Sequence, residues 1–331
     1  MTTLRGKSVG VSNPSSSDPV VSRKERGFLS ERLAHFAAVV AAVLLALAAR
    51  SSGLDAQIVV EDDLGRRVEF AEPPCRIVSL IPAVTEIVFA LGAEACLVGR
   101  SIYDNYPAAV TSIPEVGQAI GANVERVLNR RPDLVILVAG SDNAGTVEQF
   151  QRLGVPSLLF RLNQLPELQS AIARLGAILR RQAEADSLWQ AIDGQLESVR
   201  SRTHGLVRPT VYYDIAYPPP ITIGAGSYLD TLLDIAGGRN AFHDTAAPSP
   251  AVSLEAIVVR DPDVIVFPVS QTWGGAAHPG ERPLWRGLRA VATGNVRQVD
   301  ADLLHRLGPR VGEAARQLAE AIHPDPAAGA P

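Results

Sequence analysis

Cysteine is scarce in this sequence, and lysine is confined to its N-terminal region. Cys75 and Cys96 are the only cysteines in 331 residues, and Lys24 is the last lysine. Two cysteines cannot form a structural zinc site without other ligands. The formal net charge is −4, and a mildly acidic chain without a basic stripe argues against a nucleic-acid partner.

Several catalytic signatures are also missing. The six histidines have no tight metal-ligand spacing, HExxH and GxSxG are absent, and the glycine run at 224–227 lacks the GK[ST] of a phosphate loop. The run Gly224 to Ser227 is better interpreted as a glycine turn with Ser227 as a helix N-cap. We therefore predict no catalytic residue, no protein-held metal and no intrinsic cofactor. One of His243, His278 and His305, or Tyr103, could still bind haem iron.

The N-terminal 56 residues have the pattern of a secretory signal. Arg23, Lys24, Arg26 and Arg32 precede an apolar run at 36–49, and small residues follow. The run is short for a bilayer span, and no cysteine follows it closely, so we expect neither a lipid anchor nor a stable membrane helix. An uncleaved anchor is the alternative to export into the periplasm.

The rest of the chain divides by its hydrophobic pattern. Residues 57–73 predict a β-hairpin, 74–164 an N-terminal α/β lobe and 205–323 a C-terminal α/β lobe, because short buried strands alternate with helices as in parallel sheets. Apolar residues at helical intervals over 165–204, without proline from Glu167 to Val207, predict one long connecting helix of roughly 35 residues. Residues 324–331 are expected to form a disordered tail.

An internal repeat supports two related lobes. Residues 124–138 read VERVLNRRPDLVILV and residues 254–268 read LEAIVVRDPDVIVFP, which align without a gap at an offset of 130. Each copy predicts a short helix, a Pro-Asp turn and a buried strand. Convergence on a common α/β junction is the alternative explanation. Two such lobes joined by a helix leave a crevice, and ligands bind there at the carboxyl ends of strands.

Loops that follow the predicted strands should line this crevice. They carry Tyr103, Asn105, Tyr217 and Trp273. Aromatic rings with amide groups suit a large, partly apolar ligand with polar edges. Cys75 begins the first strand of the N-terminal lobe and Cys96 the second. A disulfide can form if these strands are parallel neighbours; otherwise both are small buried apolar residues.

Four segments resemble a known family, the ABC-importer binding proteins with a helical backbone: RIVSLIPAVTEIVFALG, GRSIYDNYP, NVERVLNRRPDLVI and GAGSYLDTLLDIAGGRNAF. The family includes receptors for cobalamin, haem and ferric siderophores, and the similarity is greatest to the cobalamin receptors. It implies two Rossmann-like lobes with parallel sheets, a long backbone helix and a ligand cleft between the lobes. It also implies a monomeric periplasmic receptor that delivers its ligand to a permease dimer in the inner membrane.

The same resemblance implies roles for particular residues. Glu125 and Glu255, the acids inside the repeat, match the carboxylates that dock onto permease arginines. Tyr103, Asp302 and Arg306 match pocket residues. Three tryptophans of the cobalamin receptors correspond here to Ala119, Val138 and Ser249, so that Trp273 would supply aromatic surface from another loop.

We therefore expect capture of cobalamin or a related corrinoid, with haem or a ferric siderophore as the alternative. A cleft enzyme is the rival from another class, and it would need a nucleophile–base pair that we do not find.

Overall fold

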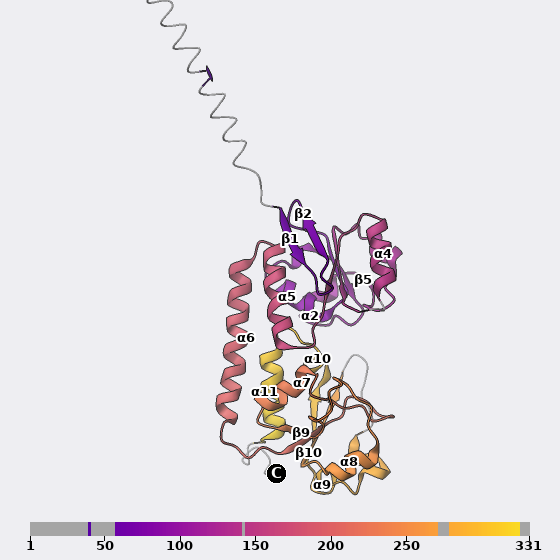
Figure 1. The fold of residues 1–331 in the computed structure, drawn as a ribbon, viewed down its shortest axis with the longest axis vertical. Coiled ribbons are helices and arrows are strands. Elements are labelled where there is room, and N and C mark those ends of the chain that lie inside the picture. Colours follow the sequence, from indigo (N-terminus) through magenta and orange to yellow (C-terminus); the bar gives the residue numbers. More distant parts are fainter. Residues whose placement is uncertain (1–38, 41–56, 141–142, 271–277, 325–331) are drawn as a thin grey trace, which may run out of the picture. The chain divides into compact units, whose positions relative to one another are not determined.

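Two parallel sheets with flanking helices make up most of the computed structural model, which describes residues 39–40, 57–140, 143–270 and 278–324 (Figure 1). The predicted signal segment lies outside the described residues except for Val39 and Val40, and so does the predicted tail from residue 325 onward. Among the helices that the model describes, none combines the length and apolar character needed to cross a bilayer.

The chain from Gln57 opens with the predicted hairpin. Strands β1 (Ile58–Glu61) and β2 (Arg67–Phe70) pair antiparallel. The buried carboxylate of Asp62 stabilises the turn. It accepts hydrogen bonds from the amides of Leu64 and Arg66 at 3.0 Å each, and it forms an ion pair with the Arg66 guanidinium at 2.6 Å.

The N-terminal lobe contains a five-stranded sheet of order β5-β4-β3-β6-β7, parallel throughout. Its strands are β3 (Ile77–Ser79), β4 (Leu97–Ser101), β5 (Glu115–Gly117), β6 (Leu134–Val138) and β7 (Ser157–Phe160). Its helices are α2 (Pro82–Ala90), α3 (Val124–Leu128) and α4 (Ala144–Arg152). The predicted strand–helix alternation is therefore present, with each strand bound to a parallel neighbour.

The C-terminal lobe contains a four-stranded parallel sheet of order β11-β10-β8-β9. Its strands are β8 (Thr210–Tyr213), β9 (Arg239–Asn240), β10 (Val264–Val269) and β11 (Val296–Asp300). Its helices are α7 (Tyr228–Ile235), α8 (Leu254–Arg260), α9 (Arg289–Ala292), α10 (Ala301–Leu304) and α11 (Val311–Ile322). The strand that follows the repeat helix is β6 in one lobe and β10 in the other, and each has a strand on both sides.

The connector differs from its prediction. It is two helices, α5 (Leu165–Ile178) and α6 (Gln182–Thr203), rather than one helix of roughly 35 residues. The chain reverses at Arg180, whose φ is 53°, and α5 packs back against α6. Gly176 permits this close approach, because a Cβ there would lie 2.6 Å from the Cβ of Ala185. The long helix that joins the lobes is therefore α6 alone.

One apolar core passes through both lobes along the helical side. It joins Ile87 of α2 and Leu175 of α5 to Leu196 of α6, and these to Leu232 of α7 and Leu318 of α11. Two smaller cores cover the opposite faces of the two sheets. In Figure 1, α6 runs beside α5 at one end and beside α11 at the other.

Candidate ligand-binding cavity and docking helices

A cavity of about 340 Å³ lies between the two lobes. The N-terminal lobe contributes residues that follow the carboxyl ends of β3, β4, β6 and β7, and the C-terminal lobe contributes residues of α7, α10 and the turn after α10. The lining includes the apolar residues Ile81, Val138, Phe160 and Leu307, together with Tyr103, Tyr228, His305 and Arg306. This is the position where parallel α/β sheets bind ligands.

A buried carboxylate, that of Asp104, stabilises the loop that carries Tyr103. Asp104 accepts a hydrogen bond from the amide of Ser101 at 2.7 Å, and its carbonyl accepts one from Arg100 at 3.1 Å. Burial raises the pKa of Asp104 to about 6. The loop presents Tyr103 at 42% exposure, with its hydroxyl donating to Gln118 at 3.1 Å. The ring can therefore face a ligand while its hydroxyl is fixed.

Arg306 binds groups of both lobes at the edge of the cavity. Within its own lobe it forms the predicted pair with Asp302, at 3.2 Å and one helical turn apart. It also donates to the Asn105 side chain at 2.6 Å and to the Tyr103 carbonyl at 2.8 Å. Four of the predicted ligand-binding residues are thus brought together in one hydrogen-bonded group.

Glu86 was not predicted, although it completes this group. It lies in α2, is 4% exposed, and accepts from the Arg310 guanidinium at 2.8 and 2.9 Å and from Arg306 at 3.3 Å. Arg310 also stacks over the ring of Tyr106 at 3.9 Å. A sequence signal existed: Glu86 is the only charged residue in the apolar run AVTEIVFAL, and such a position usually requires a partner.

Two further polar side chains of the C-terminal lobe face the cavity. The Tyr228 hydroxyl donates to the carbonyl of Leu304 at 2.5 Å, which holds α7 against α10. His305 lies 5.9 Å from the Tyr213 ring, and burial lowers the pKa of its imidazole to about 4. The imidazole is therefore neutral at neutral pH.

One of the predicted ligand-binding residues, Tyr217, is not among the residues that line the cavity. Tyr217 packs edge-on against Trp285 at 5.5 Å, and the Arg282 guanidinium lies 4.2 Å from its ring. Arg282 in turn forms a buried ion pair with Asp214 at 2.6 Å, so that Tyr217 covers a buried cation within its own lobe. Trp273 lies outside the described residues.

The predicted docking acids occupy equivalent, exposed positions. Glu125 is the second residue of α3 and Glu255 the second residue of α8. The residue two before each acid caps its helix: the Asn123 side chain accepts from the amide of Arg126 at 3.0 Å, and Ser253 from Ala256 at 3.2 Å. The internal repeat is thus reproduced in the capping geometry.

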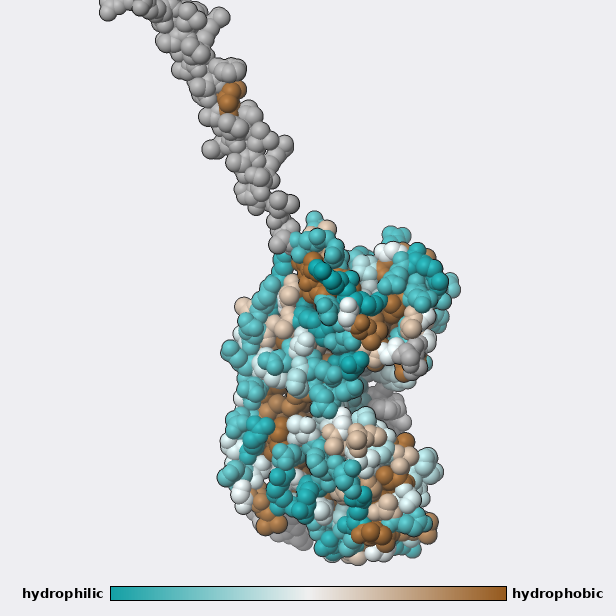
Figure 2. All heavy atoms as spheres, in the orientation of Figure 1, coloured by the Kyte–Doolittle hydropathy of each residue, from teal (hydrophilic) through white to brown (hydrophobic). Residues whose placement is uncertain are grey.

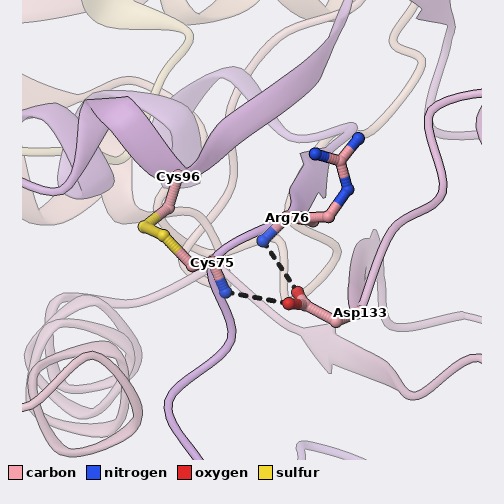
Figure 3. Close-up of a disulfide and its surroundings, with 4 residues drawn as sticks. All are labelled: Cys75, Arg76, Cys96 and Asp133. Carbon is pink, nitrogen blue, oxygen red and sulfur yellow. Dashed lines mark hydrogen bonds between the residues drawn. A yellow bond between two sulfur atoms is a disulfide. The ribbon is translucent and has the colours of Figure 1, made fainter.

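Both Pro-Asp turns of the repeat bind the start of a neighbouring strand. The Asp133 carboxylate accepts from the amides of Cys75 and Arg76, both at 2.9 Å (Figure 3). Asp263 accepts from the amide of Thr210 at 2.8 Å. Each turn therefore fixes the end of a repeat helix, α3 or α8, against the sheet of its own lobe.

Cys75 and Cys96 form a disulfide at the same edge (Figure 3). It joins Cys75, two residues before β3, to the 3₁₀ turn (Glu94–Cys96) that precedes β4. The two strands that follow, β3 and β4, are parallel neighbours, as the predicted bridge requires.

The glycine turn at 224–227 forms a helix cap, as predicted. Ser227 caps α7 by accepting from the amide of Leu229 at 3.2 Å. A Cβ on Gly224 would lie 2.2 Å from the Ala247 carbonyl, so the glycine turn is packed against protein backbone. Within the parts of the chain that the structure describes, no group of three or more His, Cys, Asp or Glu could hold a metal ion.

Comparison with known proteins agrees with this geometry. The model of the family described as periplasmic binding protein matches residues 77–303. The chain is 30% identical to an uncharacterised ABC transporter substrate-binding lipoprotein, YvrC of Bacillus subtilis strain 168, over 81% of this chain and 86% of the relative. It is 29% identical to the vitamin B12-binding protein of Salmonella typhi, over 75% and 90% of the two chains.

Solved structures show the same fold. The vitamin B12-binding protein BtuF of Vibrio cholerae superposes with a TM-score of 0.65 at 27% identity, covering 76% of this chain and 97% of that one. The periplasmic heme-binding protein RhuT of Roseiflexus gives 0.67 at 25% identity, covering 75% and 97%.

The chain therefore belongs to the periplasmic binding protein family, a family of transport receptors. More specifically, it is a substrate-binding protein of an ABC transporter, which works with a membrane permease. The predicted family, fold class and transport role are confirmed.

Proposed function

We propose that the protein captures cobalamin or a related corrinoid between its lobes and delivers it to a permease dimer in the inner membrane. The main support for this proposal is the cavity, which Tyr103 and Arg306 line from opposite lobes. The chain is also similar to vitamin B12-binding proteins over three quarters of its length. A corrinoid combines apolar ring edges with amide arms, which suits an apolar lining with Arg306 at its edge, where Asn105 and Asp302 bind the guanidinium.

A corrinoid is larger than a cavity of about 340 Å³. Its binding therefore requires Arg306 to release Asn105 and the Tyr103 carbonyl, so that the guanidinium and amide become available to the ligand. The same movement connects ligand capture to the relative position of the lobes. Because α6 joins the lobes and shares its core with both, we expect a small opening rather than a wide hinge.

Haem is the second candidate ligand, and one observation favours it. Tyr103 and His305 line the cavity from opposite lobes, and burial keeps His305 neutral by lowering its pKa to about 4. Phenolate and neutral imidazole are both ligands of haem iron. A ferric siderophore would instead use Arg306 as the cation for an anionic chelate.

Calorimetric titration of the purified protein with cyanocobalamin, haemin and a ferric hydroxamate separates these ligands. We expect one-to-one binding of cyanocobalamin, weakened by Arg306→Ala. Binding of haemin with a Soret band that changes in Tyr103→Phe and His305→Asn would transfer the assignment to haem. Failure of all three ligands to bind would contradict the proposed cargo.

We further propose that Glu125 and Glu255 dock the receptor onto basic residues of the permease. Two acids at matched positions can contact two related permease subunits, and complementary charge orients a complex more than it strengthens it. The double variant Glu125→Arg with Glu255→Arg should bind ligand normally but fail to stimulate ATP hydrolysis by the reconstituted permease. Full stimulation by this variant would contradict the docking role.

The proposal includes the place of action. The protein is exported to the periplasm by the segment 1–56 and acts there as a monomer. Fractionation of expressing cells, with the N-terminal residue of the mature chain determined by mass spectrometry, tests both export and cleavage. Recovery of the uncleaved chain in the membrane fraction would favour the anchored alternative.

A further inference from the structure

We propose that the C-terminal docking surface is apolar as well as acidic. Glu255, Val258 and Val259 of α8 would form one contact surface for the permease, here called the α8 surface. The proposal rests on the docking function above. It adds that this lobe supplies more of the docking affinity than the N-terminal lobe does.

The α8 surface follows from exposure and helical spacing. Val258 is 52% exposed and Val259 is 85% exposed. They lie three and four residues after the exposed Glu255, so that all three side chains share one face of the helix. Figure 2 shows apolar side chains at the outer end of the C-terminal lobe, near the helix labelled α8 in Figure 1.

The fold itself does not account for these valines. Helix α8 contacts the core through the fully buried Ile257 and the partly buried Leu254 and Ala256. β-Branched residues are weak helix formers, since their side chains lose rotamer freedom against the preceding turn. Exposed valines therefore add little to the stability of this helix, and beside Glu255 they form a continuous surface that a partner can cover.

The repeat provides an internal comparison. The α3 residues that correspond to Val258 and Val259 are Leu128, which is half-buried, and Asn129, which is exposed. Glu125 is followed by Arg126 where Glu255 is followed by Ala256. The two lobes thus keep the acid but differ beside it, because the first repeat has the exposed Asn129 where α8 has the exposed Val259, and the exposed Arg126 where α8 has Ala256.

Charge identifies the partner's chemistry. Hydrogen bonds from its own backbone amide and from Ser253 lower the pKa of Glu255, so that it is anionic at neutral pH. The nearest basic residue on α8, Arg260, pairs with Asp244 at 2.9 Å and lies over the Phe242 ring at 4.3 Å. The α8 surface therefore fits a partner that offers a cation beside an apolar strip.

A second copy of this chain is a poorer occupant. A symmetric dimer joined through this face would place the same patch against itself, which would bring one Glu255 towards the other. Repulsion between the two carboxylates would oppose that contact. A permease that places a cation opposite Glu255 would not meet this repulsion.

The test compares valine variants that keep the fold. Val258→Ser with Val259→Ser should weaken binding of the receptor to its permease in nanodiscs by about tenfold, the loss expected for two apolar side chains at an interface. Asn129→Ser is the repeat-matched control. Val207→Ser is the exposure-matched control, since Val207 is 88% exposed in the loop between α6 and β8. Both controls should bind as the wild type does.

The outcomes are separable from those of the docking proposal. Loss of permease binding in Glu255→Arg, with none in the double-valine variant, would leave charge docking intact and overturn the α8 surface. Normal binding by both would overturn docking itself. Sedimentation gives a third outcome: if the valines change only self-association, the surface joins copies of this chain and our assignment is wrong. Ligand titration of the double variant should be unchanged.

Discussion

Arg131 and Asp261, 130 residues apart, share the same left-handed backbone conformation, with φ of 50° and 40°. Each follows a docking helix and precedes the proline of a Pro-Asp turn. An arginine from elsewhere donates to the carbonyl of each at 2.8 Å: Arg76 to Arg131, and Arg289 to Asp261. Two non-equivalent arginines thus complete the same turn in the two lobes.

This relationship predicts that Arg76 and Arg289 position the docking helices. Arg76→Met and Arg289→Met should each lower receptor affinity for the permease by roughly fivefold, the equivalent of one hydrogen bond of about 1 kcal/mol. Ligand affinity should not change. Surface plasmon resonance against the immobilised permease measures the first quantity and calorimetry the second.

Lysine at the same positions is the matched control, because it keeps a donor for the carbonyl. Partial recovery by Arg76→Lys and Arg289→Lys would support a positioning role. An equal loss of ligand and permease affinity would instead indicate general destabilisation.

Glu86 should be the most sensitive polar residue of the cavity region. Glu86→Gln removes the charge that both Arg306 and Arg310 face, in a site where Glu86 is 4% exposed. Breaking a buried pair leaves an uncompensated charge and costs about 3 kcal/mol. Urea denaturation followed by circular dichroism should show that loss in the free energy of unfolding.

An exposed ion pair serves as the comparison for Glu86. Glu320 pairs with Arg316 at 2.8 Å on α11, where both side chains are close to half exposed. Glu320→Gln should cost about 0.5 kcal/mol or less. Similar losses in the two variants would contradict the structural role of Glu86.

The disulfide should contribute to stability through the chain that it closes. Cys75 and Cys96 are separated by 21 positions. Closing a loop of this length in the unfolded chain lowers its entropy and should stabilise the folded protein by about 3 kcal/mol. Cys75→Ser with Cys96→Ser should lower the free energy of unfolding by that amount. Reduction of the wild type should give the same loss, and the double variant should no longer respond to dithiothreitol.

His305 should make stability depend on pH. Its folded pKa, about 4, lies below its ordinary value of 6.5, so the unfolded chain takes up the proton first as the pH falls. Stability is therefore highest above pH 6.5 and decreases between 6.5 and 4. His305→Asn should become more stable relative to the wild type over that range, by about 2–3 kcal/mol.

The raised pKa of Asp104 predicts that stability changes with pH in the opposite direction, over nearly the same pH range. Its pKa is raised from 3.8 to about 6, so its contribution is greatest below pH 3.8 and is lost as the pH rises through 6. Asp104→Asn should gain stability relative to the wild type between pH 4 and 7. Parallel curves for wild type and both variants would contradict both pKa shifts.

The fold could be predicted mainly because the internal repeat is visible in the sequence. The Pro-Asp turns at Asp133 and Asp263 can be recognised from a few adjacent residues. The buried strands that follow these turns are continuous apolar runs. The reversal at Arg180 could not be predicted from such signals, because ILRRQ contains no glycine or proline. Gly176 was the useful indication, since it marks a close approach that a single straight helix does not need.

The cavity was predicted in part. Tyr103, Asn105, Asp302 and Arg306 meet because each follows or belongs to an element at the carboxyl edge of a sheet. Tyr217 also follows a strand, yet it covers the buried Asp214–Arg282 pair. Which way a loop aromatic faces depends on tertiary partners that are distant in sequence, and Arg282 is 65 residues from Tyr217.

The apolar core that continues from α2 and α5 through α6 into α7 and α11 bears on how the protein loses its structure. Although the lobes are repeats with separate sheets, each would expose the shared core if it were expressed alone. The two halves should therefore melt as one cooperative unit. The similarity of the two lobes is visible in the sequence and in the turns, but we expect neither half to fold when it is cut out and moved to another protein.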